Sequence, residues 1–183
     1  MNSIEINEFT ELQHGENNYQ SAAIAKIEGC LDFQVLSRNK ELSYLDYLNL
    51  SETVKILGEF FDVNASVLAA EASVFAVALG SSSENAFDKA LDCNPVLING
   101  CSTGFTKEVT LNLAKKLISM KVRNILAPDF SKDAFSYLLD KDIISKFSRL
   151  SNLSINFNAM KVLHSIFIPI YAILITEITI LIK

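Results

Sequence analysis

The sequence predicts an α/β fold in which helices cover both faces of a mostly parallel β-sheet. Short apolar runs alternate along the chain with longer segments whose apolar residues recur at helical spacing. Half of the 183 residues are hydrophobic, which is enough for a domain with a substantial core. The segment 64–80, NASVLAAEASVFAVALG, is apolar apart from its first residue, two serines and one charge, Glu71. We therefore expect it to form buried strand on both sides of a tight bend.

The elements expected before this segment are short strands and one helix. The N-terminal residues are polar and contain a turn-like cluster at 14–18. The loose alternation at 21–27 and the short run at 33–36 each predict a strand. Apolar residues close to helical spacing predict a helix over 45–61.

The elements that follow continue the alternation. Ser81 and Glu84 have the spacing of a capping box, so a helix should begin there. Asn94-Pro95 should end it, because the residue before a proline avoids the helical conformation. We expect a short apolar strand at 96–98 and a loop of small residues at 99–104.

Two helices around one strand are expected next. The amphipathic pattern of 107–120 predicts the first helix, and the apolar run 122–127 predicts the strand. Pro128 should break this strand, and Ser131 can cap a helix that runs to Leu139.

The composition changes near Asn152, which predicts a domain over 1–150 and an Ile-rich hydrophobic tail over 151–183. The apolar run 162–182 has the length of a membrane helix. Against a span, it contains Glu177, and a central carboxylate costs about 2.5–3.5 kcal/mol on insertion. A tail membrane helix and a buried or misplaced strand therefore stay open as alternatives, and membrane contact is not the favoured one.

The overall composition argues against several classes of protein. A net charge of −5 gives no basic surface for nucleic acid. Cys30, Cys93 and Cys101 are unclustered and odd in number, so neither a zinc site nor a disulfide framework is expected. The N-terminus is acidic and polar, unlike a signal peptide. These features predict a reduced, cytoplasmic protein.

Five stretches of the sequence carry a resemblance to a known family. They are QHGENNYQ at 13–20, NKELSYLD at 39–46, VLAAEASVFAVALG at 67–80, NPVLINGC at 94–101 and LAPDFSKDA at 126–134. In the same order they resemble the motifs R-Y-G-E-N-P-H-Q, G-K-x-L-S-Y-N-N, V-I-V-K-H-A-N-P-C-G-V-A-x-G, D-P-x-S-A-F-G-G and I-A-P-x-x-S-x-x-A. These motifs belong to the AICAR transformylase domain of the bifunctional purine biosynthesis protein (AICAR formyltransferase/IMP cyclohydrolase).

The resemblance implies a fold and a reaction. The fold is a cytidine-deaminase-like sandwich of three layers, and the reaction is formyl transfer from 10-formyltetrahydrofolate to AICAR in purine (IMP) biosynthesis. The folate is a cosubstrate, so no tightly bound cofactor and no metal are expected. The resemblance covers roughly residues 10–150 and only the first half of the transformylase domain.

The departures from the family motifs fall on the residues that carry its chemistry. The family's Lys-His pair, which stabilises charge and assists proton removal, falls on Ala70 and Glu71. The Arg and Tyr that help hold the nucleotide fall on Gln13 and His14, which removes a bidentate phosphate contact. The resemblance thus implies no catalytic residue, and a truncated, divergent relative that is inactive by itself.

A further departure concerns an acidic position shortly before the family's I-A-P, which falls on Arg123 or Asn124. Positions that are kept, such as Gly15 and Gly80, are those of turns and packing. The scaffold residues are therefore better retained than the chemical ones.

Four residues have alternative interpretations. Glu71 is either a replacement general base or, the favoured interpretation, a strand-end carboxylate in contact with solvent. His14 either touches a phosphate or is solvated in its turn, which we favour. The loop around Gly100 either cradles an anion or is a plain connection, and Gly100 is the one substrate-binding candidate. Cys101 is better explained as a buried structural cysteine than as a nucleophile.

Three hypotheses follow for the whole chain. The first is the inactive transformylase relative, with AICAR as the ligand it would retain. The second is a non-catalytic dimerisation or interaction module that pairs with itself or with a full-length paralogue. The third is a decayed gene fragment without function.

Overall fold

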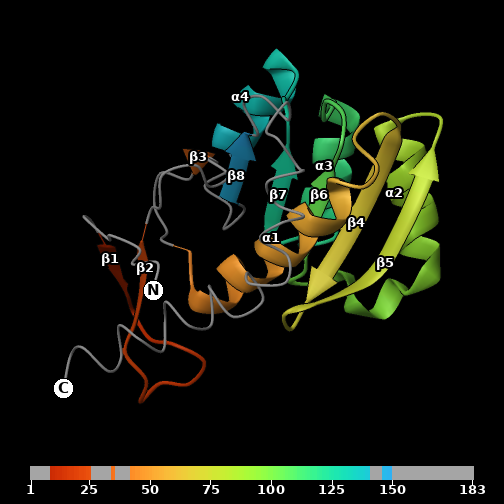
Figure 1. The fold of residues 1–183 in the computed structure, drawn as a ribbon. Helices are drawn as coiled ribbons and strands as arrows, with labels where there is room; N and C mark the ends of the chain where they lie inside the picture. The colour runs from red at the N-terminus through yellow and green to blue at the C-terminus, as the bar shows by residue number, and fades with distance from the viewer. Residues whose placement is uncertain (1–8, 26–33, 36–41, 141–145, 150–183) are drawn as a thin grey trace. The chain divides into compact units, whose positions relative to one another are not determined.

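The computed structural model of the chain describes residues 9–25, 34–35, 42–140 and 146–149 (Figure 1). The chain divides into two compact units, each described here by itself. Among the described residues, 9–25 and 42–45 belong to the first unit and the remainder to the second. The hydrophobic tail, with its two alternatives, and the boundary near Asn152 lie outside the described residues. Within these ranges, no helix has the length and apolar character needed to cross a membrane.

The first unit contains a two-stranded antiparallel sheet. Strand β1 (Phe9–Leu12) pairs with β2 (Ala22–Ala25). The strand predicted at 21–27 is confirmed where the structure describes it, whereas β1 was not foreseen in the polar N-terminal segment. The turn expected at 14–18 lies between the two strands.

The second unit is built on a six-stranded sheet with the order β3-β8-β7-β6-β4-β5 (Figure 1). Its strands are β3 (Gln34–Val35), β4 (Asn64–Ala70), β5 (Ser73–Gly80), β6 (Ser102–Phe105), β7 (Asn124–Ala127) and β8 (Lys146–Arg149). β3 lies within the strand predicted at 33–36, and β7 lies within the one predicted at 122–127.

The predicted α/β class is confirmed, but the expectation of a mostly parallel sheet is wrong. Only β6–β7 and β7–β8 are parallel, while the other three neighbouring pairs are antiparallel. The reason lies in the segment 64–80: a two-residue loop joins β4 to β5, and such a loop can only connect antiparallel strands. β4 also runs antiparallel to β6 on its other side.

Helices lie against both faces of this sheet (Figure 1). They are α1 (Tyr44–Leu57), α2 (Ser83–Cys93), α3 (Leu111–Ser119) and α4 (Lys132–Asp140), with a short 3-10 helix η1 (Pro95–Ile98). α1 covers one face and approaches β6 closely at Gly104, where an added Cβ would lie 2.3 Å from Cγ2 of Thr53. Glycine at this position therefore allows the helix to sit directly on the sheet.

The opposite face carries the main hydrophobic core, which α2, α3 and α4 cover. Phe87 of α2 and Phe105 of β6 are fully buried, with ring centroids 6.2 Å apart. Leu113 and Leu117 of α3 pack in the same cluster as Ile125 of β7. The apolar spacing that predicted an amphipathic helix over 107–120 thus marks the face of α3 that enters the core.

The burial expected for 64–80 holds for its first strand only. Residues 65–69 of β4 are buried, and the predicted bend lies at Glu71 and Ala72. In β5 only Ala76 is buried, while Val77 and Leu79 are 37% and 45% exposed. The expectation of a buried second strand is wrong because β5 is the last strand in the described sheet order and α2 packs on one of its faces.

The starts of α1, α2 and α3 differ from the prediction by one to four residues. The N-cap of α2 is Ser82 rather than Ser81: its hydroxyl accepts the Asn85 N–H at 3.1 Å. α3 begins after its N-cap Thr110. Ser131 accepts the Ala134 N–H at 3.3 Å and caps α4, as predicted.

The expectations for 96–98 and 99–104 are wrong. Residues 95–98 form η1, because the Asn94 side chain accepts the Val96 N–H and Pro95 suits the first position of a helix. Residues 102–105 form the buried strand β6, in which Gly104 leaves room for α1. Small residues indicated close packing here, not a loop.

Candidate functional site

One end of the sheet in the second unit gathers positions from two of the five motifs and from the segment just before a third. The strand register places Ala69 opposite Ser102, and Ser102 opposite Asn124. The β4–β5 turn and the starts of β6 and β7 therefore lie at the same end. We call residues 70–73, 99–102 and 121–124 the hairpin end of the sheet. It contains Ala70 and Glu71, Gly100, and the Arg123-Asn124 pair.

Other motif positions lie elsewhere. Gly80 pairs with Asn64 at the opposite end of the sheet, and Pro128 to Ser131 follow the far end of β7. The first motif, 13–20, belongs to the other unit.

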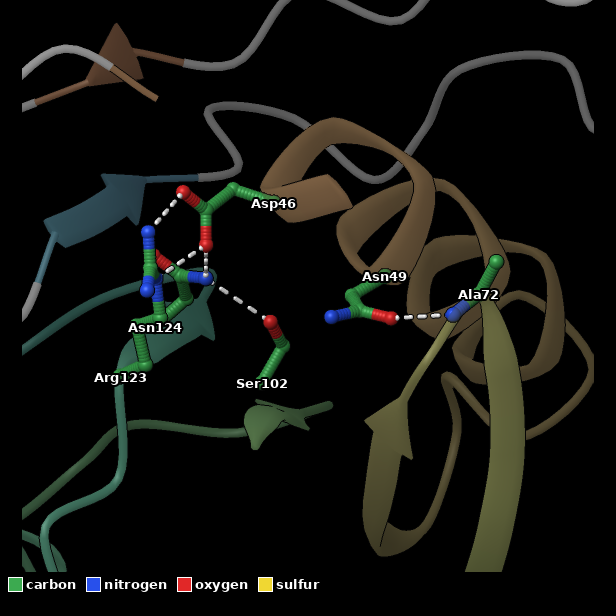
Figure 2. A network of polar contacts seen from close by, with 6 residues as sticks. All are labelled: Asp46, Asn49, Ala72, Ser102, Arg123 and Asn124. Carbon is green, nitrogen blue, oxygen red and sulfur yellow. Dashed lines mark hydrogen bonds and ion pairs between the residues drawn. The ribbon is translucent and has the colours of Figure 1, made fainter. Parts of the chain in front are cut away.

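Helix α1 supplies the polar side chains that reach the hairpin end. Asp46, Asn49 and Thr53 are buried and recur at helical spacing, so they lie on one face of α1. The Thr53 hydroxyl donates to the Asn49 carbonyl at 2.8 Å and stays within the helix. Asp46 and Asn49 instead form hydrogen bonds to the hairpin end (Figure 2).

Asp46 is the centre of a network that joins α1 to β6 and β7 (Figure 2). Arg123 donates from Nε to Oδ1 at 2.7 Å and from Nη2 to Oδ2 at 3.0 Å. Asn124 Nδ2 donates to Asp46 Oδ1 at 2.7 Å and to Ser102 Oγ at 2.9 Å. The Asp46 carboxylate is thus held by a bidentate guanidinium and an amide, an arrangement that compensates the burial of its charge.

The two charged partners differ in exposure. The Asp46 side chain is 3% exposed, whereas that of Arg123 is 45% exposed. Asn124 Oδ1 is buried, and within the described part of the chain it has no hydrogen-bond partner. The network therefore ends in solvent on the arginine side and in the sheet on the asparagine side.

The end of β4 and the β4–β5 turn hold Ala70 and Glu71, on which the resemblance places the family's Lys-His pair. Glu71 and Ala72 have φ of 51° and 59°, which L-residues seldom adopt. The Ala72 N–H donates to Asn49 Oδ1 at 2.8 Å (Figure 2). Glu71 is exposed at the tip, which agrees with the favoured interpretation of a strand-end carboxylate. The alternative of a buried general base does not fit, because this carboxylate is not buried.

Gly100 lies in an exposed turn just before β6, with φ of 80°. An added Cβ would meet no atom within 4 Å, so there is room beside it. Its N–H donates to the Lys121 carbonyl at 3.0 Å, and the Arg123 N–H donates to the Cys101 carbonyl at 2.8 Å. Since the Gly100 N–H is already engaged, an anion at this turn would need other donors. The substrate-binding role of Gly100 stays a prediction.

Cysteine placement agrees with a structural role for Cys101. This residue is fully buried, and burial raises the pKa of its thiol to about 12. Such a thiol is protonated at neutral pH and is a poor nucleophile. Cys93 is exposed, and Cys30 lies outside the described residues. Across the described ranges, His, Cys, Asp and Glu do not cluster in a way that could hold a metal ion.

The first motif forms a self-contained turn in the first unit. The Gly15 N–H donates to the Gln20 carbonyl at 2.7 Å, and the Glu16 N–H donates to Gln20 Oε1 at 3.2 Å. His14 is half-buried beside this turn. Burial, and next the charge of Glu16, raise the pKa of Tyr44. Gly15, Glu16 and Gln20 of the motif therefore have a structural role in this turn.

Sequence reasoning missed the roles of Asp46, Asn49 and Ser102. The motif gives Asp46 no contact of its own, and its partners lie 77 and 78 positions away along the chain. The one available signal was the recurrence of polar residues at 46, 49 and 53 on the same helical face as the apolar Leu50, Val54 and Leu57.

Comparisons with known proteins agree on one family. The model of the AICARFT/IMPCHase bienzyme family matches residues 1–160. The bifunctional purine biosynthesis protein PurH of Persephonella marina is 35% identical over 136 residues, which cover 71% of this chain and 26% of that protein. PurH of Fusobacterium nucleatum is 34% identical over 143 residues, 76% of this chain and 28% of that protein. The chain thus spans about a quarter of the length of these relatives.

A solved structure shows a weaker likeness. Acinetobacter baumannii RibD, form 2, has a TM-score of 0.43 and 10% identity, over 57% of this chain and 36% of that chain. A likeness at this level supports no conclusion about the fold.

Proposed function

The chain belongs to the AICARFT/IMPCHase bienzyme family, and from this premise we propose that it is a catalytically inactive relative of the first half of the AICAR transformylase domain. The relation to purine biosynthesis proteins rests on the family match. The inactivity of this chain by itself is the proposal.

The observation that carries the proposal is the composition of the β4–β5 tip. The positions of the family's lysine and histidine hold Ala70 and the exposed Glu71. Neither residue can supply the positive charge that would stabilise a developing oxyanion. Alanine has no proton to exchange, and a solvated carboxylate near the folate and phosphate groups would add negative charge to an anionic reaction.

The proposal includes a fold of the cytidine-deaminase type with three layers. Its support is the strand order β5-β4-β6-β7-β8, in which β4 alone runs against the others, with helices on both faces. An experimental structure of the chain, superposed on an AICAR transformylase, would test this part of the proposal.

The test of function is an assay of formyl transfer from 10-formyltetrahydrofolate to AICAR with purified protein. We expect no turnover above the blank. The matched control is the full-length PurH of Persephonella marina, which verifies the assay. Turnover by this chain that the variant Glu71→Gln abolishes would overturn the proposal, because it would make Glu71 a replacement base.

Ligand binding is a separate part of the proposal. We propose that AICAR is the ligand that the scaffold would retain, with Gly100 at the binding surface and folate as a cosubstrate only in an active form. Isothermal titration with AICAR, for the wild type and for Gly100→Ala, tests this. Binding that the substitution weakens supports a role for Gly100, and the absence of heat in both leaves a scaffold without ligand.

A second candidate is a non-catalytic interaction module, which pairs with itself or with a full-length paralogue. The observation in its favour is β5, which exposes Val77 and Leu79 and, in the described sheet, has no neighbour on its outer side. Size-exclusion chromatography with light scattering, alone and with the paralogue, tests it. A monomer that leaves the paralogue unchanged would count against this candidate. For both candidates we propose a cytoplasmic location, with no nucleic-acid partner.

A further inference from the structure

The β4–β5 turn adopts a conformation that its own sequence does not favour. Ala70 pairs with Ser73, so Glu71 and Ala72 form a two-residue loop in which both residues have positive φ. Turns of this kind normally contain glycine, asparagine or aspartate at these positions, because side chains with a Cβ are strained there. Two consecutive strained residues persist only when the surrounding structure imposes their conformation.

The contact that can impose it comes from α1. Asn49 Oδ1 accepts the Ala72 N–H at 2.8 Å, from a position 23 residues earlier in the chain (Figure 2). Asn49 is 4% exposed, so its side chain has little freedom to move away. One helical turn earlier, Asp46 fixes the same helix to Arg123 and Asn124. The acceptor is therefore held in place by a helix that is itself anchored to the hairpin end.

We propose that Asn49 is the positioning residue of the β4–β5 tip: its side-chain oxygen holds Ala72 at positive φ and so fixes the direction in which positions 70 and 71 project. This inference rests on the proposed function only for the importance of positions 70 and 71, on which the family's Lys-His pair falls. The geometric claim itself concerns Asn49 and Ala72 and needs no ligand.

Amide hydrogen exchange measured by NMR tests the claim at the residue concerned. In Asn49→Ala we expect the Ala72 amide to exchange at least about tenfold faster, because its acceptor is gone. The amides of Val67 and Leu68 in β4 should keep their rates, because the change is local. Asn49→Asp retains an acceptor oxygen and should keep the Ala72 rate within about threefold of the wild type.

A matched control is available at the other end of the sheet. Asn85 Oδ1 accepts the Ser81 N–H at 3.1 Å, so Asn85→Ala removes an equivalent contact without touching the tip. The Ala72 rate should be unchanged in this variant. A second arm combines Asn49→Ala with Ala72→Gly: glycine adopts positive φ without strain, so the tip should recover the backbone chemical shifts of the wild-type turn.

Several results would overturn the proposal. An unchanged Ala72 rate in Asn49→Ala would do so, as would an equal acceleration of Ala72, Val67 and Leu68, which would indicate general destabilisation. A tip that stays altered in the double variant would also contradict it. If Asn49→Ala does not fold, the double variant decides: its folding supports the proposal, and its failure to fold overturns it. These outcomes are independent of the AICAR assay, so failure of the proposed function would be seen separately.

Discussion

Two hydrogen bonds join the Arg123 guanidinium to the Asp46 carboxylate, at 2.7 Å from Nε and 3.0 Å from Nη2. The carboxylate lies on α1, and the cation and the amide lie just before β7 and at its start. The resemblance places Asp46 where the family motif ends in asparagine, and Arg123 or Asn124 where the family has an acidic residue. The structure shows that Asp46 contacts both of these residues.

Substituting Arg123 should cost more stability than substituting its partner Asp46. Arg123→Ala removes the bidentate, charged partner of a buried carboxylate, so we expect a loss of about 2–4 kcal/mol in the free energy of unfolding. Asp46→Asn should lose less, about 1–2 kcal/mol, because the half-exposed guanidinium can turn to water. Urea denaturation measures both.

A surface pair supplies the control for this prediction. Lys116 and Asp88 form an ion pair whose side chains are both more than a third exposed, so Lys116→Ala should change stability by less than about 1 kcal/mol. If Arg123→Ala lost no more than Lys116→Ala, Asp46 would not depend on its bidentate partner.

Gly80, Gly100 and Gly104 of the second unit should differ in how much stability they lose on substitution by alanine. At Gly80 an added Cβ would lie 2.3 Å from the backbone nitrogen of Ala86, and backbone cannot move aside, so we expect a loss above about 3 kcal/mol. At Gly104 the nearest atoms belong to the side chains of Thr53 and Leu57, and we expect about 1–3 kcal/mol.

At Gly100 an added Cβ would meet no atom within 4 Å, but the φ of 80° is strained for alanine. We therefore expect Gly100→Ala to lose about 1 kcal/mol in the free energy of unfolding. Denaturant midpoints of the three variants should therefore fall in the order Gly100→Ala, Gly104→Ala, Gly80→Ala, with the last least stable. A Gly80 variant as stable as the Gly100 variant would show that α2 can move away from β5.

The start of α2 gives a test of the corrected cap. Ser82→Ala should lower the free energy of unfolding by about 1 kcal/mol, because the Asn85 N–H loses its acceptor. Ser81→Ala should cost less, since the Ser81 hydroxyl has only a 3.5 Å contact with Asn85 Oδ1. Thermal unfolding of the two variants measures the difference. Equal losses, or a larger loss for Ser81→Ala, would restore the capping box expected from the sequence.

Local patterns predict most elements of the second unit, because buried strands and amphipathic helices have characteristic patterns of apolar residues. The apolar composition of 64–80 predicts β4 and a tight bend within the segment. The exposure of β5 was not predictable, because a strand at the margin of a sheet can have the same apolar composition as a central one. The position of a strand in the sheet depends on pairing between segments that are far apart in the sequence.

The contacts of the candidate site could not be predicted from the sequence. The resemblance implies that the family's Lys-His pair falls on Ala70 and Glu71, and the structure places Glu71 at the exposed tip with the half-buried Ala70 beside it. The network of Asp46, Asn49 and Asn124 depends on pairs far apart in sequence. The polar residues on the buried face of α1 are a signal for that helix face, but the sequence does not indicate their partners. The small residues of 99–104 predict a loop, because the approach of α1 to Gly104 is a tertiary contact that the local pattern does not show.

The buried thiol of Cys101 predicts a pH dependence of stability. Burial raises the pKa of this group from the ordinary 9.0 to about 12 in the folded chain. The folded state thus keeps its proton at a pH where the unfolded state has lost it. Below pH 9 the thiol does not make the free energy of unfolding depend on pH. Between pH 9 and about 12 it lowers the free energy of unfolding by about 1.4 kcal/mol per pH unit.

Comparison with Cys101→Ala isolates this contribution from the lysines and tyrosines that titrate in the same range. The difference in the free energy of unfolding between the wild type and this variant should be constant up to pH 9 and should then shift against the wild type. Thiol labelling gives an independent check in a Cys30→Ser background: Cys93 should react at once and Cys101 only on unfolding. A Cys101 that reacts as fast as Cys93, or a difference that does not change above pH 9, would show that this thiol reaches water in the folded chain.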